Sequence, residues 1–142
     1  MSQNPSTTTL LLAILYHESG RAPVAAGETL SHAVQSPQAR PFVEWPSLPS
    51  DARAGRLMTA RALLERYDIS VVIPDLGTEP VSVDDLARAI HECERGAVEA
   101  GLVLVKLDRP WVAFADLPAQ AQEGRRRQAQ YLLARLWWLL RG

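Results

Sequence analysis

Two His-Glu pairs are the first residues whose chemistry suggests a catalytic or metal site. They are His17-Glu18 and His91-Glu92. A helical zinc site of this kind needs a second histidine four residues after the first, so that both imidazoles lie on one helical face. Arg21 and Arg95 occupy those positions instead. We therefore favour a contact that ties the helix to its neighbour, or to a ligand, over acid-base catalysis.

Arginines placed close to aromatic residues suggest a second kind of chemistry. Arg40 opens a short segment that contains Trp45, and Arg109 opens the segment that contains Trp111. An aromatic face beside a guanidinium suits a planar, anionic ligand such as a nucleotide. The alternative is that each ring fills the core of a small structural unit. Both interpretations hold if the ring lines a cleft.

These residues recur because the chain contains two copies of one sequence unit. Residues 40–67 and 109–136 align without a gap and agree at 12 of 28 positions. Residues 17–27 and 91–101 agree at 6 of 11 positions. Such self-similarity indicates one structural unit used twice.

Arg125 is the candidate for an inward role on the last helix, because it matches Arg56 in the first copy. Its neighbours Arg126 and Arg127 have no such match and are expected to be solvated. The predicted ligand-binding residues are Arg40, Trp45, Arg56, His17, His91, Arg109, Trp111 and Arg125. We predict no catalytic residue, no metal site and no cofactor. Cys93 has no base at motif spacing and is expected to be a small buried residue.

Four helices must position these side chains. Apolar residues at helical spacing, together with capping residues, predict them over residues 9–21, 48–66, 83–100 and 117–140. Two β-branched runs, 69–73 and 102–107, predict short strands. The fold class that follows is mainly α with short β-strands.

Particular residues are expected to begin and end the helices. Ser47 and Asp116 each precede a Leu-Pro step and are predicted N-caps. Ser82, with Asp85 three residues later, predicts a capping box. Gly101 is the predicted stop of the third helix.

Composition restricts the class of protein. The chain has 142 residues, is 47% hydrophobic and has a net charge of −1, as expected of a globular domain without a general attraction to nucleic acid or anionic membranes. One cysteine rules out an internal disulfide and favours a reducing compartment. The start of the chain lacks the basic region of a signal peptide. We therefore expect a cytoplasmic protein with no nucleic-acid or membrane partner.

The ordered set of matches resembles the ryanodine-receptor repeat domain. The first copy carries the family's pattern as Leu12-Ala13, His17, Arg40-Pro41, Leu48-Pro49, Arg56 and Leu63-Leu64. The second carries it as Leu86-Ala87, His91, Arg109-Pro110, Leu117-Pro118, Arg125 and Leu132-Leu133. The resemblance implies two helical-hairpin repeats, related by a pseudo-twofold axis and sharing one core.

The extent of the two copies and a turn-rich stretch between them give the expected domain boundaries. We expect a disordered N-terminus over residues 1–9, a first ryanodine-receptor-like repeat over 10–73, a linker over 74–81 and a second repeat over 82–142.

The function that the resemblance implies is non-enzymatic recognition of a nucleotide or nucleotide-derived signal in the cleft between the repeats. In a phage or bacterial setting this would be a sensor or sponge for an immune messenger. The alternative is a structural or protein–protein interaction module without a small-molecule ligand. The apolar residues Trp137, Trp138 and Leu140 near the C-terminus predict packing on the other copy or a homo-oligomer contact.

Overall fold

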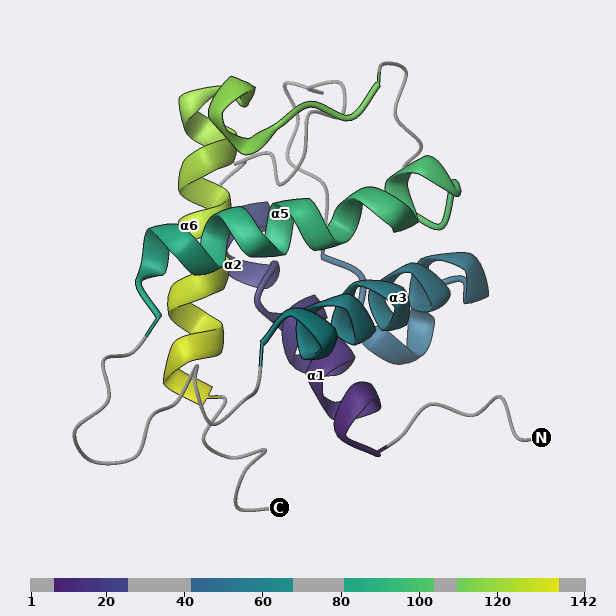
Figure 1. Cartoon of the computed structure of the whole chain (residues 1–142). Coiled ribbons are helices and arrows are strands. Elements are labelled where there is room, and N and C mark those ends of the chain that lie inside the picture. Colours follow the sequence, from purple (N-terminus) through teal and green to yellow (C-terminus); the bar gives the residue numbers. More distant parts are fainter. Residues whose placement is uncertain (1–6, 26–41, 68–80, 104–109, 136–142) are drawn as a thin grey trace.

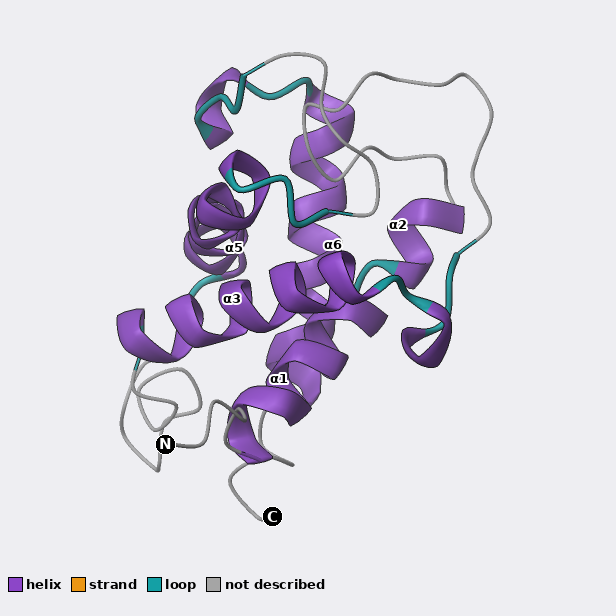
Figure 2. Cartoon of the chain, turned by 90° about the vertical axis from the view of Figure 1, so that its right-hand side faces the viewer, coloured by secondary structure: helices purple, strands orange, loops and turns teal. Residues whose placement is uncertain are grey.

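Four long helices pack together in the computed structural model, which describes residues 7–25, 42–67, 81–103 and 110–135 (Figure 1). The long helices are α1 (Thr7–Glu18), α3 (Ser50–Arg66), α5 (Val83–Glu99) and α6 (Ala119–Arg135). A short helix, α2 (Arg21–Ala25), follows α1, and the 3-10 turns η1 (Trp45–Ser47) and η2 (Phe114–Asp116) precede α3 and α6. Within these ranges the fold is all-α and contains no strand (Figure 2).

The predicted strands are not found where the structure describes the chain. The run 69–73 lies outside the described residues, and so does most of 102–107. Leu102 and Val103, the described start of the second run, form no strand. Arg40, Arg109 and the apolar residues Trp137, Trp138 and Leu140 also lie outside the described residues.

The predicted helices are confirmed within the described ranges, with one difference near the N-terminus. α3 and α6 are each 17 residues long and begin at equivalent positions of the two sequence copies. The first predicted helix, 9–21, is wrong as one element because α1 ends at Glu18 and α2 begins at Arg21. Pro23 lies within α2 and cannot donate a backbone hydrogen bond, so a continuous helix would lose a bond at this point.

Both ends of α5 follow from sequence signals. The Ser82 hydroxyl accepts a hydrogen bond from the backbone N–H of Asp85 at 3.1 Å, as the capping box predicts. At the other end, Gly101 has a φ of 74°. Its N–H donates to the carbonyl of Val98, and the N–H of Leu102 donates to that of Ala97. This is the Schellman arrangement, which requires the left-handed conformation that glycine adopts without strain.

The predicted caps of α3 and α6 are wrong. Ser47 and Asp116 are the last residues of η1 and η2, and the N-cap of α3 is Pro49. Backbone bonds hold each 3-10 turn, as in Ser47 N–H donating to the Glu44 carbonyl at 2.9 Å. The polar residue before Leu-Pro therefore closes a turn, and the helix begins after the proline.

The four long helices form a closed ring of contacts. α5 packs against α3 and α6, and α1 packs against the same two helices. One buried apolar cluster includes residues from every long helix, among them Leu12, Leu63, Ile90 and Leu132. The halves of the sequence therefore share a core in the described chain.

α3 and the end of α5 approach each other closely in this packing. A Cβ placed on Gly55 would lie 1.7 Å from the carbonyl oxygen of Leu102. Only a residue without a side chain fits there. Among the described residues, no helix combines the length and apolar character needed to cross a membrane.

Candidate anion-binding site

Two histidines make the same backbone contact in the two halves of the chain. His17 Nε2 lies 2.7 Å from the carbonyl oxygen of Val43, and His91 Nε2 lies 2.7 Å from that of Val112. A carbonyl oxygen only accepts, so each Nε2 carries the proton and donates it. These bonds attach α1 and α5 to the extended segments that precede η1 and η2.

The other ring nitrogen of each histidine accepts from an arginine. Arg56 Nε donates to His17 Nδ1 at 3.3 Å, and Arg125 Nε donates to His91 Nδ1 at 3.4 Å. An acceptor at Nδ1 and a donor at Nε2 describe a neutral imidazole. Burial lowers the pKa of His17 from its usual value of 6.5, and Arg56 lowers it further, while the bond to Val43 opposes the shift.

Each histidine also lies among aromatic rings. The His17 ring is 4.7 Å from Phe42 and 5.9 Å from Trp45, between ring centroids. The His91 ring stacks on Trp111 at 4.8 Å with an interplanar angle of 17°, and it meets Phe114 edge-on at 6.3 Å. Trp45 and Trp111 therefore each pack beside the histidine of their own half.

The arginine one turn after each histidine contacts the same aromatic ring. The guanidinium carbon of Arg21 is 4.3 Å from the centroid of Phe42, and that of Arg95 is 4.9 Å from the centroid of Trp111. These cation–π contacts stabilise the ring position. The pair of His and Arg thus ties a helix to the neighbouring segment, as the spacing suggested.

Arg125 is enclosed by polar partners. Its side chain is 1% exposed and forms an ion pair with Glu94. Nη1 donates to Gln128 Oε1 at 2.7 Å, and the guanidinium also interacts with the phenol of Tyr16. A buried guanidinium is stable only with such compensation. The buried position of Arg125 agrees with the inward placement expected from the sequence.

A serine connects this cluster to α1. Gln128 Nε2 donates to Ser19 Oγ at 3.2 Å, and the Ser19 hydroxyl donates to the carbonyl of Tyr16. Residues from α5 and α6 in the second half are thereby bonded to the end of α1 in the first half. The buried polar cluster lies where the two halves meet.

Arg56 reaches the same tyrosine but has different partners. Its guanidinium carbon is 5.7 Å from the centroid of Tyr16, and the side chain is half-buried. Burial and the charge of Glu94 raise the pKa of Tyr16 to about 12, against the opposing charges of Arg125 and Arg56. Two guanidinium groups therefore surround one tyrosine, with one ion-paired carboxylate among the described residues of the cluster.

The acids that directly follow the two histidines have other partners. Glu18 pairs with Arg21 at 3.1 Å, and Glu92 pairs with Arg66 at 2.6 Å, both at the surface. The carboxylate that offsets the charge of Arg125 is that of Glu94.

Four residues of the cluster, Tyr16, Ser19, Glu94 and Gln128, were not among the predicted site residues. Comparison of the copies contained a signal for one of them. Glu94 stands three residues after His91, on the same helical face, where the first copy has Gly20. The signal for Glu94 is therefore a sequence difference between the two copies, not a shared residue.

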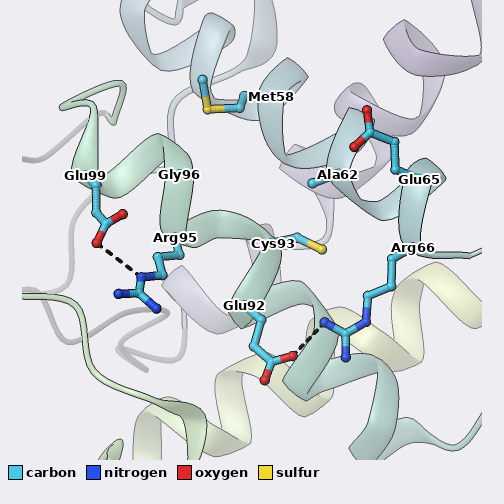
Figure 3. Close-up of a pocket in the computed structure, with 9 residues that line it drawn as sticks. All are labelled: Met58, Ala62, Glu65, Arg66, Glu92, Cys93, Arg95, Gly96 and Glu99. Atoms are coloured by element: carbon cyan, nitrogen blue, oxygen red, sulfur yellow. Dashed lines mark hydrogen bonds and ion pairs between the residues drawn. The ribbon is translucent and has the colours of Figure 1, made fainter.

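A separate open groove lies between α3 and α5 (Figure 3). Its volume is about 560 Å³, and its lining includes Met58 and Cys93 together with the surface pairs Arg66–Glu92 and Arg95–Glu99. None of the six predicted site residues that the structure describes lines this groove. The half-buried Cys93 is part of its wall, and burial raises the pKa of the thiol.

No group of three or more metal-ligating side chains comes together within the described ranges. Comparison with protein-family models, with curated proteins and with solved structures gave no match.

Proposed function

We propose that this chain is a non-enzymatic binding module that recognises a nucleotide or nucleotide-derived signal where its two halves meet. We also propose that the halves are ryanodine-receptor-type repeats related by a pseudo-twofold axis. The contacts His17–Val43 and His91–Val112 support the repeat, because the same atoms make the same bond at equivalent positions.

The excess of positive charge around Tyr16 is the observation that carries the binding role. Arg56 lies over the ring of this buried tyrosine, Arg125 interacts with its phenol, and Glu94 pairs with Arg125. Charges interact more strongly where water is partly excluded, so a second anion near Arg56 is favoured. A guanidinium matches phosphate with two parallel hydrogen bonds, and the neighbouring aromatic rings suit a planar base.

The contacts of the histidines support a non-enzymatic role. Each imidazole is engaged at both ring nitrogens, one by a backbone carbonyl and the other by an arginine. Neither ring has a nitrogen available for transferring a proton to a substrate. The resemblance to the family then implies a sensor or sponge for a signal molecule.

The charged groove between α3 and α5 favours a second candidate, a protein–protein interaction module. Its lining includes both acidic and basic side chains, with Met58 and Cys93 as its less polar part. Such a surface suits a partner with complementary charges more than a buried small ligand.

A thermal-shift screen of the full chain separates these candidates. The probes are adenine nucleotides, ADP-ribose derivatives and cyclic dinucleotides. At 100 times its dissociation constant, a true ligand adds about 2.7 kcal/mol of stability, which corresponds to about 10 °C in Tm for a domain of this size. A shift with a nucleotide probe supports the proposal.

A flat response to every nucleotide contradicts it. A matched pair of variants then tests the second candidate. Replacing Glu92 by Lys reverses a charge in the groove, whereas Arg61→Gln alters an exposed residue of α3 outside it.

A further inference from the structure

The two arginines that contact Tyr16 are held by the same bond but have different surroundings. Arg56 and Arg125 each donate from Nε to the Nδ1 atom of a histidine, at 3.3 and 3.4 Å. This hydrogen bond holds the Nε atom of each guanidinium in place. The two halves differ in the groups that bind the outer nitrogens, Nη1 and Nη2.

In the second half, protein groups occupy the outer nitrogens of the guanidinium. Arg125 uses Nη2 for Glu94 and Nη1 for Gln128. In the first half, the equivalent positions are Gly20 and Thr59. Gly20 has no side chain, and the Thr59 hydroxyl donates to the carbonyl of Gly55 in its own helix at 3.0 Å. The carboxylate and the amide of the second half thus have no counterpart at these two positions of the first.

Two described acids of the first half, Glu18 and Glu44, are already paired. Glu18 and Glu44 both bind Arg21, at 3.1 and 2.7 Å. Within the described part of the chain, no carboxylate forms an ion pair with Arg56. Arg56 is half-buried and has no fixed counter-charge among the described residues, whereas the buried Arg125 has one.

We infer that the outer nitrogens of Arg56 bind an oxyanion group of the ligand in the place that the Glu94 carboxylate takes beside Arg125. Gly20 contributes no side chain at that place. The group is a phosphate or a carboxylate, because both present two oxygens at the spacing of the guanidinium nitrogens. This inference rests on the proposed binding role and names the part of the ligand that the first half recognises.

The first test uses inorganic phosphate and acetate as probes, compared with chloride at constant ionic strength. Wild type and the control Arg61→Gln are expected to gain thermal stability, and Arg56→Gln is expected to gain none. Loss of a charge-assisted pair of hydrogen bonds weakens binding about tenfold or more. A larger response to phosphate identifies a phosphate group, and a larger response to acetate identifies a carboxylate. Equal responses in Arg56→Gln and wild type, or no response in wild type, overturn the inference.

A second test places the missing carboxylate in the chain. Gly20→Glu is expected to raise Tm relative to Gly20→Gln, and to abolish the response to phosphate and acetate. The difference between the two variants should disappear when Arg56→Gln is added. A difference that persists in that background overturns the inference. If the Gly20 variants do not fold, the responses of Arg56→Gln and Arg61→Gln to phosphate and acetate still test the inference.

Nucleotide binding in the same variants distinguishes this inference from the proposed function. Unchanged nucleotide binding by Arg56→Gln overturns the inference and leaves the proposed function standing. Arg56-dependent binding of phosphate, without nucleotide binding by wild type, supports the subsite and contradicts a nucleotide ligand.

Discussion

At the scale of single residues, two arginines at equivalent positions differ in whether a carboxylate pairs with them. Glu94 gives Arg125 a counter-charge inside the protein, and the first copy has Gly20 at the equivalent position. Arg56 consequently keeps the same histidine contact but has its outer nitrogens unpaired with any described carboxylate. A buried charge without a partner is costly, so the contribution of Glu94 can be measured directly.

Glu94→Gln is expected to lower the free energy of unfolding by about 3–5 kcal/mol, because it leaves the guanidinium of Arg125 buried without a counter-charge. The matched control is Glu92→Gln, which breaks the exposed pair with Arg66 and should cost no more than about 1 kcal/mol. Urea denaturation of both variants provides the comparison. Equal losses in the two would mean that the Arg125–Glu94 pair does not stabilise the fold.

The stability of the chain should fall in mild acid because of His17. Its pKa in the folded chain lies below the usual 6.5, mainly through burial, so the unfolded chain binds the proton more strongly. This contribution is complete above about pH 6.5 and is lost as the pH falls from there through the folded pKa. Urea midpoints measured from about pH 7 to about pH 5 should drop less in His17→Gln than in wild type. An identical drop in both would assign the effect to other groups.

Only part of this site could be predicted from the sequence. Identity between the copies indicated His17, His91, Arg56 and Arg125, all of which the structure places in two equivalent contacts. Glu94 was missed because a lone acid in an amphipathic helix resembles a solvated residue. Its burial depends on α6 lying across α5, which is a tertiary property.

At the scale of elements, helix existence was predictable and helix beginnings were less so. Repeated apolar spacing predicted α3 and α6. Ser82 and Gly101 predicted the two ends of α5. Ser47 was misplaced because a Ser before Leu-Pro satisfies the capping pattern equally well as part of a 3-10 turn. Backbone bonds within the turn decide between the two, and they leave no signal in the sequence.

The contact between α3 and the end of α5 predicts an unusual sensitivity to one methyl group. Gly55→Ala would place Cβ 1.7 Å from the Leu102 oxygen, so the helices must move apart. We expect a loss of about 3 kcal/mol, at the upper end for overpacking. Thermal or urea denaturation would measure it.

Gly96→Ala is the matched control for that substitution. Gly96 is an exposed residue of α5, and its added Cβ would meet only Met58 Sδ, at 3.4 Å. Alanine favours a helix over glycine, so this variant should be neutral or more stable by up to about 1 kcal/mol. A Gly55→Ala variant as stable as Gly96→Ala would contradict the close packing of α3 on Leu102.

At the scale of the whole molecule, the closed ring of helices brings both halves to one centre. α1 and α3 from the first half and α5 and α6 from the second contact one another around a shared apolar cluster (Figure 1). Tyr16 lies at the polar part of this centre, between one enclosed arginine and one half-buried arginine. The sequence repeat predicted two like units, whereas their different charge at this centre is the basis of the proposed binding role.

The most direct test of that account is an NMR titration of the full chain with inorganic phosphate, following the arginine side-chain Nε–H signals. The Arg56 signal is expected to shift and saturate, while the Arg125 signal, which belongs to a guanidinium already paired with Glu94, stays in place. Arg56→Gln identifies the signal of Arg56. A saturating shift at Arg56 alone would support an open anion site in the first half. An unmoved Arg56 signal, or equal shifts at Arg56 and Arg125, would contradict it.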